Sequence, residues 1–386
     1  MKKAGLLAFV ALGFAACNDA PTAARPNEAP DAPELIPNHY IVVLRDGGPQ
    51  LSSALATAAG AKITYSYEAA LKGFAAEMTP DAAALLARDP RVKYVEQDQV
   101  MRATTTQTGA TWGIDRIDQR SRPTDGSFTY ASTGSGVTAY IIDTGILFSH
   151  SEFGGRAVTG VDEVTAGGNA QDCNGHGTHV SGTVGGATYG VAKGVSLVAV
   201  RVLDCGGSGS TSGVIAGVNW VAANHTSPAV ANMSLGGGAS TALDDAVRSA
   251  IASGVTFGIA AGNGNFLGIA QDACKTSPAR VAEAITVGAT TNTDAKTSWS
   301  NYGNCVDIFA PGNNITSSWY TSNTATNTIS GTSMATPHVV GVAAQYLSLN
   351  PTATPAEVAA AISANSTKGV VTSSKTTNNN LLFTDY

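Results

Sequence analysis

Three polar residues in glycine-rich surroundings could together form a nucleophilic catalyst. Asp143 ends an apolar run before Thr-Gly, His176 has a glycine on each side, and Ser333 lies in a Gly-Thr-Ser-Met-Ala-Thr-Pro sequence. A serine hydroxyl becomes an effective nucleophile when a histidine accepts its proton and a carboxylate orients that histidine. Taken singly, Asp143 would be a common turn residue and Ser333 a common helix cap. Together, in the order Asp, His, Ser, they predict acyl-transfer chemistry.

Alternating strand and helix patterns must position these residues. Near-continuous apolar strands separated by helices predict an α/β fold with a mostly parallel sheet, covered by helices on both faces. The carboxyl ends of such strands are the usual place for a site, and Asp143 stands at one of them. Glycines around His176 leave its imidazole room, and Ser333 is expected where a loop enters a helix. The expected strands are 137–142, 195–203, 229–235, 255–261 and 284–289, and the expected helices are 214–223, 243–252 and 334–349.

A smaller domain is expected before the sheet. Residues 36–102 read as βαββαβ, which predicts a small α+β, ferredoxin-like domain. Residues 104–111 are polar and without a pattern, and we interpret them as a linker open to proteolysis. The larger domain is expected over 103–386. Near its end, Thr354, Pro355 and Glu357 predict a helix that begins with a capping box.

The amino-terminal segment is an export signal by its pattern. Residues 1–16 begin with Met-Lys-Lys and continue as an apolar stretch too short to span a bilayer, which predicts a signal peptide, and 17–35 are expected to be a spacer. Ala-Ala-Cys ending at Cys17 is similar to a lipobox. Two readings therefore stay open, a precursor acylated at Cys17 or an ordinary signal peptide cut near Ala16. Both place the protein outside the cytoplasm, where disulfides persist.

Composition excludes several classes of protein. The 386-residue chain has a formal net charge of -6, so nucleic acid is not an expected partner. Its 43% hydrophobic residues are enough for a large core, which excludes disorder throughout. Five cysteines make an odd number, so at least one is free, pairs between chains or differs chemically from the rest.

The three motifs are similar to the signatures of the subtilisin-like serine peptidases, and the match is best with their proteinase K and aqualysin branch over about residues 104–386. The resemblance implies that Asn263, in Ala-Ala-Gly-Asn, is the side-chain donor of an oxyanion hole beside the Ser333 N–H. It also implies that residues 36–102 are a propeptide that assists folding and inhibits the enzyme intramolecularly, with cleavage between Arg102 and Thr106. The expected activity is that of a secreted, autoprocessed serine endopeptidase of broad specificity acting on proteins and peptides.

The resemblance extends to disulfides, the substrate cleft and structural Ca²⁺. It implies the pairs Cys173–Cys205 and Cys274–Cys305, which would leave Cys17 unpaired and absent from the mature chain. Substrate would lie along glycine-rich segments, with a preference for apolar or aromatic residues before the cut bond. The substrate-lining residues are Gly207, Ser208, Gly209, Ser234, Leu235 and Gly236. Oxygen ligands suit calcium. The calcium ligands would be Asp307, Ala282 and Ala284 at one site, and Asp115, Asp118, Gln119, Asp125 and Ser127 at a second.

Two other classes of function can be weighed. His176 and His179 could be a metal pair, but they are three apart without the glutamate of a His-Glu-x-x-His metallopeptidase. A binding protein that kept only the scaffold should have lost one of Asp143, His176, Asn263 or Ser333, and none is lost. We expect the mature enzyme to be a monomer without a membrane anchor.

Overall fold

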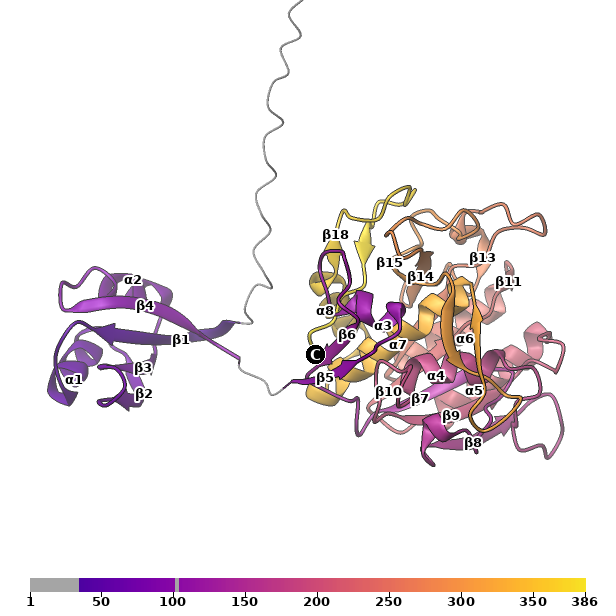
Figure 1. Cartoon of the computed structure of the whole chain (residues 1–386), viewed down its shortest axis with the longest axis horizontal. Helices are drawn as coiled ribbons and strands as arrows, with labels where there is room; N and C mark the ends of the chain where they lie inside the picture. The colour runs from indigo at the N-terminus through magenta and orange to yellow at the C-terminus, as the bar shows by residue number, and fades with distance from the viewer. Residues whose placement is uncertain (1–34, 101–103) are drawn as a thin grey trace, which may run out of the picture. The chain divides into compact units, whose positions relative to one another are not determined.

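The computed structural model describes residues 35–100 and 104–386, which form two compact units (Figure 1). The expected signal peptide, spacer and Cys17 lie outside the described residues. No helix within the described ranges is both long and apolar enough to cross a membrane.

The first unit is a four-stranded antiparallel sheet with two helices. Its strands follow the order β2-β3-β1-β4, and one buried cluster joins the sheet to the helices. The hydroxyl of Thr79 accepts the N–H of Ala82 (3.2 Å) and caps α2. The expected βαββαβ order is confirmed. Its elements are β1 (Leu35–Leu44), α1 (Pro49–Ala58), β2 (Lys62–Tyr67), β3 (Gly73–Glu77), α2 (Pro80–Leu86) and β4 (Val92–Gln99).

The second unit is built on a nine-stranded sheet whose pairings are parallel except at β18–β19. The strand order is β18-β19-β15-β14-β12-β10-β7-β9-β8. From β7 the sheet extends through β9 to the edge strand β8 on one side, and through β10, β12 and β14 on the other. The strands are β7 (Thr138–Asp143), β8 (Ala157–Asp162), β9 (Ser196–Arg201), β10 (Ala229–Met233), β12 (Val255–Ala260), β14 (Ile285–Thr290), β15 (Ile308–Pro311), β18 (Thr367–Lys368) and β19 (Asn380–Leu381).

Helices cover both faces of this sheet. α4, α7 and α8 pack on one face, whereas α5 and α6 pack against each other and on the opposite face. Alternate residues of β7 serve the two cores, with Ile141 in one and Ile142 in the other. The α/β fold and its mostly parallel sheet are therefore confirmed. The helices are α3 (Trp112–Ile117), α4 (His176–Gly185), α5 (Thr211–Asn224), α6 (Thr241–Ala252), α7 (Thr332–Leu349) and α8 (Pro355–Asn365), with short 3-10 turns η1 (Ser151–Phe153) and η2 (Ala273–Lys275).

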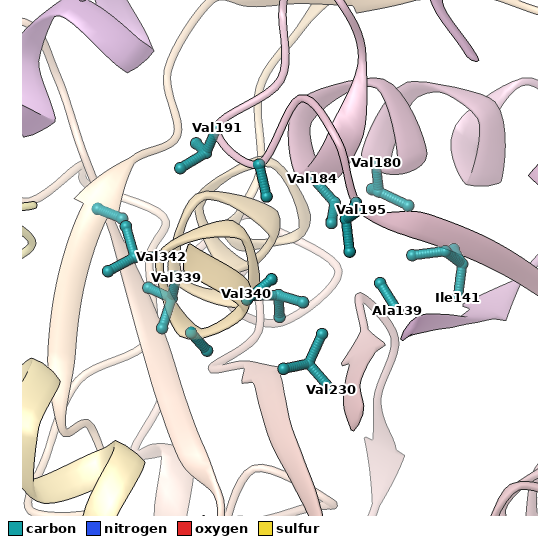
Figure 2. Close-up of a cluster of buried hydrophobic side chains, with 14 of the residues drawn as sticks. Ala139, Ile141, Val180, Val184, Val191, Val195, Val230, Val339, Val340 and Val342 are labelled. Carbon is teal, nitrogen blue, oxygen red and sulfur yellow. The ribbon is translucent and has the colours of Figure 1, made fainter. Parts of the chain in front are cut away.

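Helix α7 passes through the middle of the core on its side of the sheet, so nearly all faces of the helix carry buried residues. Figure 2 shows valines of α7 and α4 gathered with residues of β7 and β10. The labelled residues on these elements are Val339, Val340, Val342, Val180, Val184, Ala139, Ile141 and Val230. This packing fixes the start of α7, where Ser333 lies, relative to the end of β7, where Asp143 lies. The predicted capping box of α8 is also present, with Thr354 and Glu357 bonded reciprocally.

The predicted linker at 104–111 is wrong in part. Residues 105–108 form β5 (Thr105–Thr108), which pairs antiparallel with β6 (Ser127–Tyr130) in the second unit. The three threonines favour a strand because their side chains are β-branched. An exposed ribbon, however, has no alternation of apolar and polar residues, so the segment lacks the pattern by which strands are usually predicted. The other small ribbons are β11 (Gly237–Gly238) with β13 (Thr276–Ser277), and β16 (Ile315–Ser318) with β17 (Thr326–Ile329).

Candidate active site

Asp143 and His176 form a directly bonded pair at the carboxyl end of the sheet. Asp143 is the last residue of β7 and is fully buried, and His176 is the first residue of α4. His176 Nδ1 lies 2.8 Å from Asp143 Oδ1 and 3.0 Å from Oδ2. A carboxylate can only accept, so Nδ1 carries the proton and Nε2 is left as the basic nitrogen.

The carboxylate also sets the proton affinity of the imidazole. Burial disfavours the imidazolium, but the negative charge of Asp143 and its hydrogen bond outweigh burial, so the pKa of His176 is raised above its ordinary 6.5. The side chain of His176 keeps a quarter of its surface exposed. The pair therefore holds a histidine that can take up a proton from one side while Asp143 stabilises the resulting charge from the other.

Glycine and threonine bring α4 against the turn that follows β7. A Cβ on Gly177 would lie 2.1 Å from the carbonyl oxygen of Gly145, so only glycine allows this approach. The hydroxyl of Thr144 accepts the Gly177 N–H (2.8 Å) and donates to Asp172 (2.9 Å). Asp172 also accepts the N–H and hydroxyl of Thr178. Sequence reasoning gave neither residue a role, although Thr144 belongs to the first motif and Asp172 lies four residues before His176.

Ser333 is the second residue of α7, where backbone N–H groups have no partner within the helix. Its hydroxyl donates to the carbonyl oxygen of Ser234 (3.1 Å). In return, the hydroxyl of Ser234 donates to the carbonyl oxygen of Ser333 (2.9 Å). That carbonyl would ordinarily receive the N–H of residue 337, but Pro337 has none. The proline in the third motif thus frees an acceptor that ties the end of β10 to the start of α7.

Asn263 lies beyond β12 with its side-chain amide oriented by Thr332. Its Oδ1 accepts both the backbone N–H and the hydroxyl of Thr332, each at 2.8 Å. Two donors fix which end of the amide is oxygen, so Nδ2 is free to donate elsewhere. An ideal Cβ on Gly331 would lie 3.4 Å from Asn263 Nδ2 and 3.5 Å from the Ser333 nitrogen. The two N–H donors therefore border one small space, as an oxyanion hole requires.

Two adjoining cavities meet at these residues. The first, of about 520 Å³, is lined by His176 and by every residue expected to contact substrate. The second, of about 420 Å³, is lined by Ser333, Asn263 and the segment 260–265, and its lining residues are all uncharged. Residues 235–238 line both cavities. The structure thus places His176, with its partner Asp143, at one cavity and Ser333 and Asn263 at the adjoining one, and the predicted cleft segments line the first.

Both predicted disulfides are present in the structure. Cys173 is bonded to Cys205 and Cys274 to Cys305. The first links the segment before His176 to the glycine-rich wall of the cleft, and Asn174 Nδ2 adds a bond to the carbonyl oxygen of Cys205 (3.0 Å).

The first set of predicted calcium ligands lies at the amino ends of the parallel strands, opposite to the carboxyl ends where Asp143 and His176 lie. Ala282, Ala284 and Asp307 line one cavity of about 830 Å³, beside the amino ends of β14 and β15. Asp307 Oδ2 accepts the Thr286 N–H (2.8 Å), and burial raises the pKa of the Asp307 carboxyl to about 6.

The second set of predicted calcium ligands is interlinked. Asp115 accepts the side-chain amide of Gln119 (2.8 Å), and Asp125 accepts the N–H and hydroxyl of Ser127. Asp118 Oδ2 accepts a backbone N–H, while its Oδ1 is buried without a partner. Burial and the two neighbouring carboxylates raise the pKa of Asp118 to about 7. Within residues 35–100 and 104–386, no three His, Cys, Asp or Glu side chains are arranged as a metal site by themselves.

The alternative metal pair does not fit the structure. His179 is fully buried in α4, its Nε2 lies 3.0 Å from the carbonyl oxygen of Ile315, and burial lowers its pKa to about 3. A ring committed to a backbone acceptor packs the helix and does not share a ligand site with His176, whose Nδ1 is bonded to Asp143.

Comparisons with known proteins agree with this geometry. The family model described as "Subtilase family" matches residues 134–382, and the one described as "Peptidase inhibitor I9" matches residues 27–104. The chain belongs to the subtilase family and carries an inhibitor-type propeptide domain. It is a serine endopeptidase, a hydrolase of peptide bonds.

Similar proteins include an extracellular serine proteinase of Thermus sp. (strain Rt41A), 55% identical over 410 residues that cover 99% of both chains. Alkaline serine exoprotease A of Vibrio alginolyticus is 55% identical over 82% of this chain and 59% of that protein. The solved structure of a cold adapted subtilisin-like serine proteinase is 55% identical, with a TM-score of 0.68, and covers 72% of this chain and 98% of that one.

Proposed function

We propose that this chain is the precursor of a secreted serine endopeptidase that uses Ser333 as nucleophile, His176 as base and Asp143 as orienting carboxylate. The observation that carries the proposal is the bonded Asp143–His176 pair beside a cavity that adjoins the one lined by Ser333 and Asn263. Family membership implies such a triad, and these are the residues of the three motifs.

The reaction follows from the donors and acceptors. Substrate displaces the Ser333 hydroxyl from Ser234, and His176 Nε2 accepts its proton as Oγ attacks the peptide carbonyl. The negative charge that develops on the carbonyl oxygen is stabilised by Asn263 Nδ2 and the Ser333 N–H. His176 then gives the proton to the leaving amine, and water hydrolyses the acyl-enzyme by the same steps in reverse.

The substrate is proposed to be an extended polypeptide with an apolar or aromatic residue before the cut bond. The second cavity, beside Ser333, is lined by uncharged residues only, so it offers no partner for a lysine or arginine side chain. The exposed glycines of segments 206–209 and 236–238 allow a peptide backbone to approach closely. Broad specificity is proposed because glycines make up much of these walls and neither cavity is lined by an acidic residue, a lysine or an arginine.

Residues 36–102 are proposed to be an intramolecular inhibitor, cut from a mature domain within 103–386. The match to an inhibitor domain and the division of the chain into two compact units after residue 101 support this. Because β5 begins at Thr105, a cut between Arg102 and Thr105 leaves that strand whole. Extracellular relatives support secretion, whereas acylation of Cys17 has no support in the comparisons. We propose a monomeric mature enzyme.

Structural Ca²⁺ is proposed at the two predicted sites. The second set fits a cation because Asp118 Oδ1 is buried and unpartnered beside two further carboxylates. The first fits because the buried Asp307 carboxyl shares its cavity with Ala282 and Ala284. Calcium would supply positive charge that braces these surface segments, and the chemistry stays with the triad.

The decisive experiment compares wild type with Ser333→Ala. Wild type should be released as a mature chain and react with a sulfonyl fluoride at Ser333, whereas the variant should keep residues 36–102 and stay as the larger precursor. Ser330→Ala, three residues earlier and on the exposed strand side of the motif, is the matched control and should process normally. Equal processing of Ser333→Ala and wild type would refute self-cleavage.

A further inference from the structure

A second buried carboxylate lies at the start of α4, beside the Asp143–His176 pair. Asp172 is 5% exposed and stands four residues before His176. Its two oxygens accept five hydrogen bonds, all from neutral N–H and hydroxyl donors. Both oxygens accept and neither donates, which is the pattern of an ionised carboxylate. The reaction proposed above gives this buried negative charge no part.

Asp172 holds the backbone on both sides of His176. Its Oδ1 accepts the N–H groups of Asn174 (2.9 Å) and Gly175 (3.0 Å), which come immediately before the histidine. Its Oδ2 accepts the N–H (2.9 Å) and the hydroxyl (2.5 Å) of Thr178, two residues after it. A carboxylate is also favoured here because the first N–H groups of a helix have no partner within it and lie at the positive end of its dipole. The imidazole therefore extends from a backbone that is fixed over residues 174–178.

Thr144 connects Asp172 to the other half of the pair. The N–H of Thr144 donates to Asp143 Oδ1 (2.7 Å), and its hydroxyl donates to Asp172 Oδ1 (2.9 Å). The same hydroxyl accepts the Gly177 N–H (2.8 Å). A carboxylate that only capped α4 would need no bond to the turn after β7. Both halves of the pair are thus tied to one buried side chain.

Asp172 also contributes to the electrostatics of the base. Burial lowers the pKa of His176, whereas Asp143, by its charge and its hydrogen bond, and Asp172, by its charge, raise it, and the net shift is upward. The charge of Asp172 acts in the same direction as that of Asp143 but is the smaller of the two contributions.

The elements packed on α4 bring few other ionisable groups toward this imidazole. Burial lowers the pKa of His179, in α4 itself, to about 3 and that of His338, in α7, to about 4, so both rings are neutral. Strand β16 has no ionisable residue, and Glu152 of η1 and Arg201 of β9 are bonded to other partners. The two carboxylates are therefore the charges that act on the base.

We propose that Asp172 is a positioning residue of the catalytic base, which holds His176 and Asp143 in one geometry and whose negative charge stabilises the imidazolium formed when Ser333 attacks. This rests on the proposed function and adds a second carboxylate to it. Asp172 lines neither of the two cavities, so it acts through the pair and not by contact with substrate. Its loss should therefore lower kcat and leave KM nearly unchanged.

The test compares wild type with Asp172→Asn as secreted, processed enzymes, on one peptide nitroanilide at one ionic strength. An amide accepts at one end only, so some donors lose their acceptor and the charge is removed. We expect kcat to fall roughly 10-fold, because a hydrogen bond to a charged group contributes about that factor, and KM to change less than about 2-fold. The acid limb of kcat/KM against pH should move to lower pH, by less than in Asp143→Asn.

Asp162→Asn is the matched control. Asp162 is also a buried carboxylate that holds a loop, since it accepts the N–H groups of Val164 (3.0 Å), Thr165 (2.8 Å) and Ala170 (3.2 Å) and pairs with an arginine of β9. It is not among the groups that shift the pKa of His176. Its replacement should lower Tm, because it breaks a buried ion pair, yet leave kcat within about 2-fold and the acid limb in place.

A second variant covers the case in which Asp172→Asn does not fold. Thr144→Val keeps every carboxylate and removes only the hydroxyl that links Asp172 to Gly177, so kcat should fall roughly 5-fold with the acid limb unmoved. An unmoved limb in Asp172→Asn, an equal movement in Asp162→Asn, or full kcat in Thr144→Val would overturn the proposal. A wild type that fails to react with a sulfonyl fluoride would instead overturn the proposed function itself.

Discussion

Thr332 offers the sharpest test of how the fold positions Asn263, the proposed oxyanion donor. Its hydroxyl accepts the Gly262 N–H (3.1 Å) and donates to Asn263 Oδ1 (2.8 Å). Thr332→Val keeps the shape of the side chain and removes both bonds, while the backbone N–H of residue 332 still holds Oδ1. We expect Asn263 to remain in place but to be held by one hydrogen bond in place of two.

The magnitude follows from that count. One neutral hydrogen bond is worth about 1 kcal/mol net, which corresponds to a fall of about 5-fold in kcat at 1.36 kcal/mol per tenfold. Asn263→Ala removes the donor itself, at a cost of roughly 10²–10³ in kcat, a range known from subtilisin and not worked out from this structure. KM should change little in either variant, because the contact strengthens as the carbonyl oxygen becomes negative.

A double-mutant cycle decides whether Thr332 acts through Asn263. Initial rates on one peptide nitroanilide are measured for wild type, both single variants and the double variant, below the temperature at which any of them unfolds. If Thr332 only positions the amide, Thr332→Val should cost nothing further once Asn263 is alanine. A further fall of about 5-fold in the double variant would refute the reasoning.

Three further predictions concern the base, a buried ion pair and calcium. Asp143→Asn should lower kcat about 10⁴-fold and move the acid limb of the profile of kcat/KM against pH to lower pH. The shift is expected because the carboxylate raises the pKa of His176 and only the neutral ring is a base, so an unmoved limb would contradict the prediction. Asp294→Asn leaves the buried Arg116 guanidinium without its charged partner, so it should lower Tm of the sulfonylated enzyme by roughly 6–12 °C in calorimetry. Asp245→Asn, in an exposed pair, should lower Tm by under about 2 °C, and similar shifts in the two variants would contradict the prediction. Asp118→Asn should lower Tm in excess calcium but not in chelator, because without a cation its buried oxygen has no partner, and equal losses in both would count against the site.

Chain pattern alone predicted much of the architecture. The apolar runs at 137–142 and 255–261 became β7 and β12 within a residue or two, because buried parallel strands need continuous apolar sequence. Polar edges were harder to predict: the strand at 105–108 is made of threonine and glutamine, and its pairing with β6 depends on a partner about twenty residues away.

The site could be predicted in its residue types but not in its supports. Asp143, His176 and Ser333 stand in short motifs, but the motifs do not show which side chains hold one another: both bonds that orient Asn263 come from Thr332, 69 residues along the chain. Asn301, whose side chain bonds the backbone at both ends of the loop 264–271, belongs to no motif. Its three hydrogen bonds exist only because β12 and the loop that follows it pass beside it.

The sequence by itself predicted the reacting groups and an export signal and determined most of the strands and helices, because these depend on local residue type and on periodicity. Only the tertiary structure decided which atoms meet. The bond between His176 and Asp143 spans 33 residues and that between Ser333 and Ser234 spans 99, and both arise where neighbouring parallel strands end at one edge of the sheet. The exposure of the Phe-Leu-Gly-Ile run at 266–269 is likewise set by the tertiary structure. Its apolar sequence alone predicts burial, whereas the hydrogen bonds to Asn265 and Asn301 hold it at the surface.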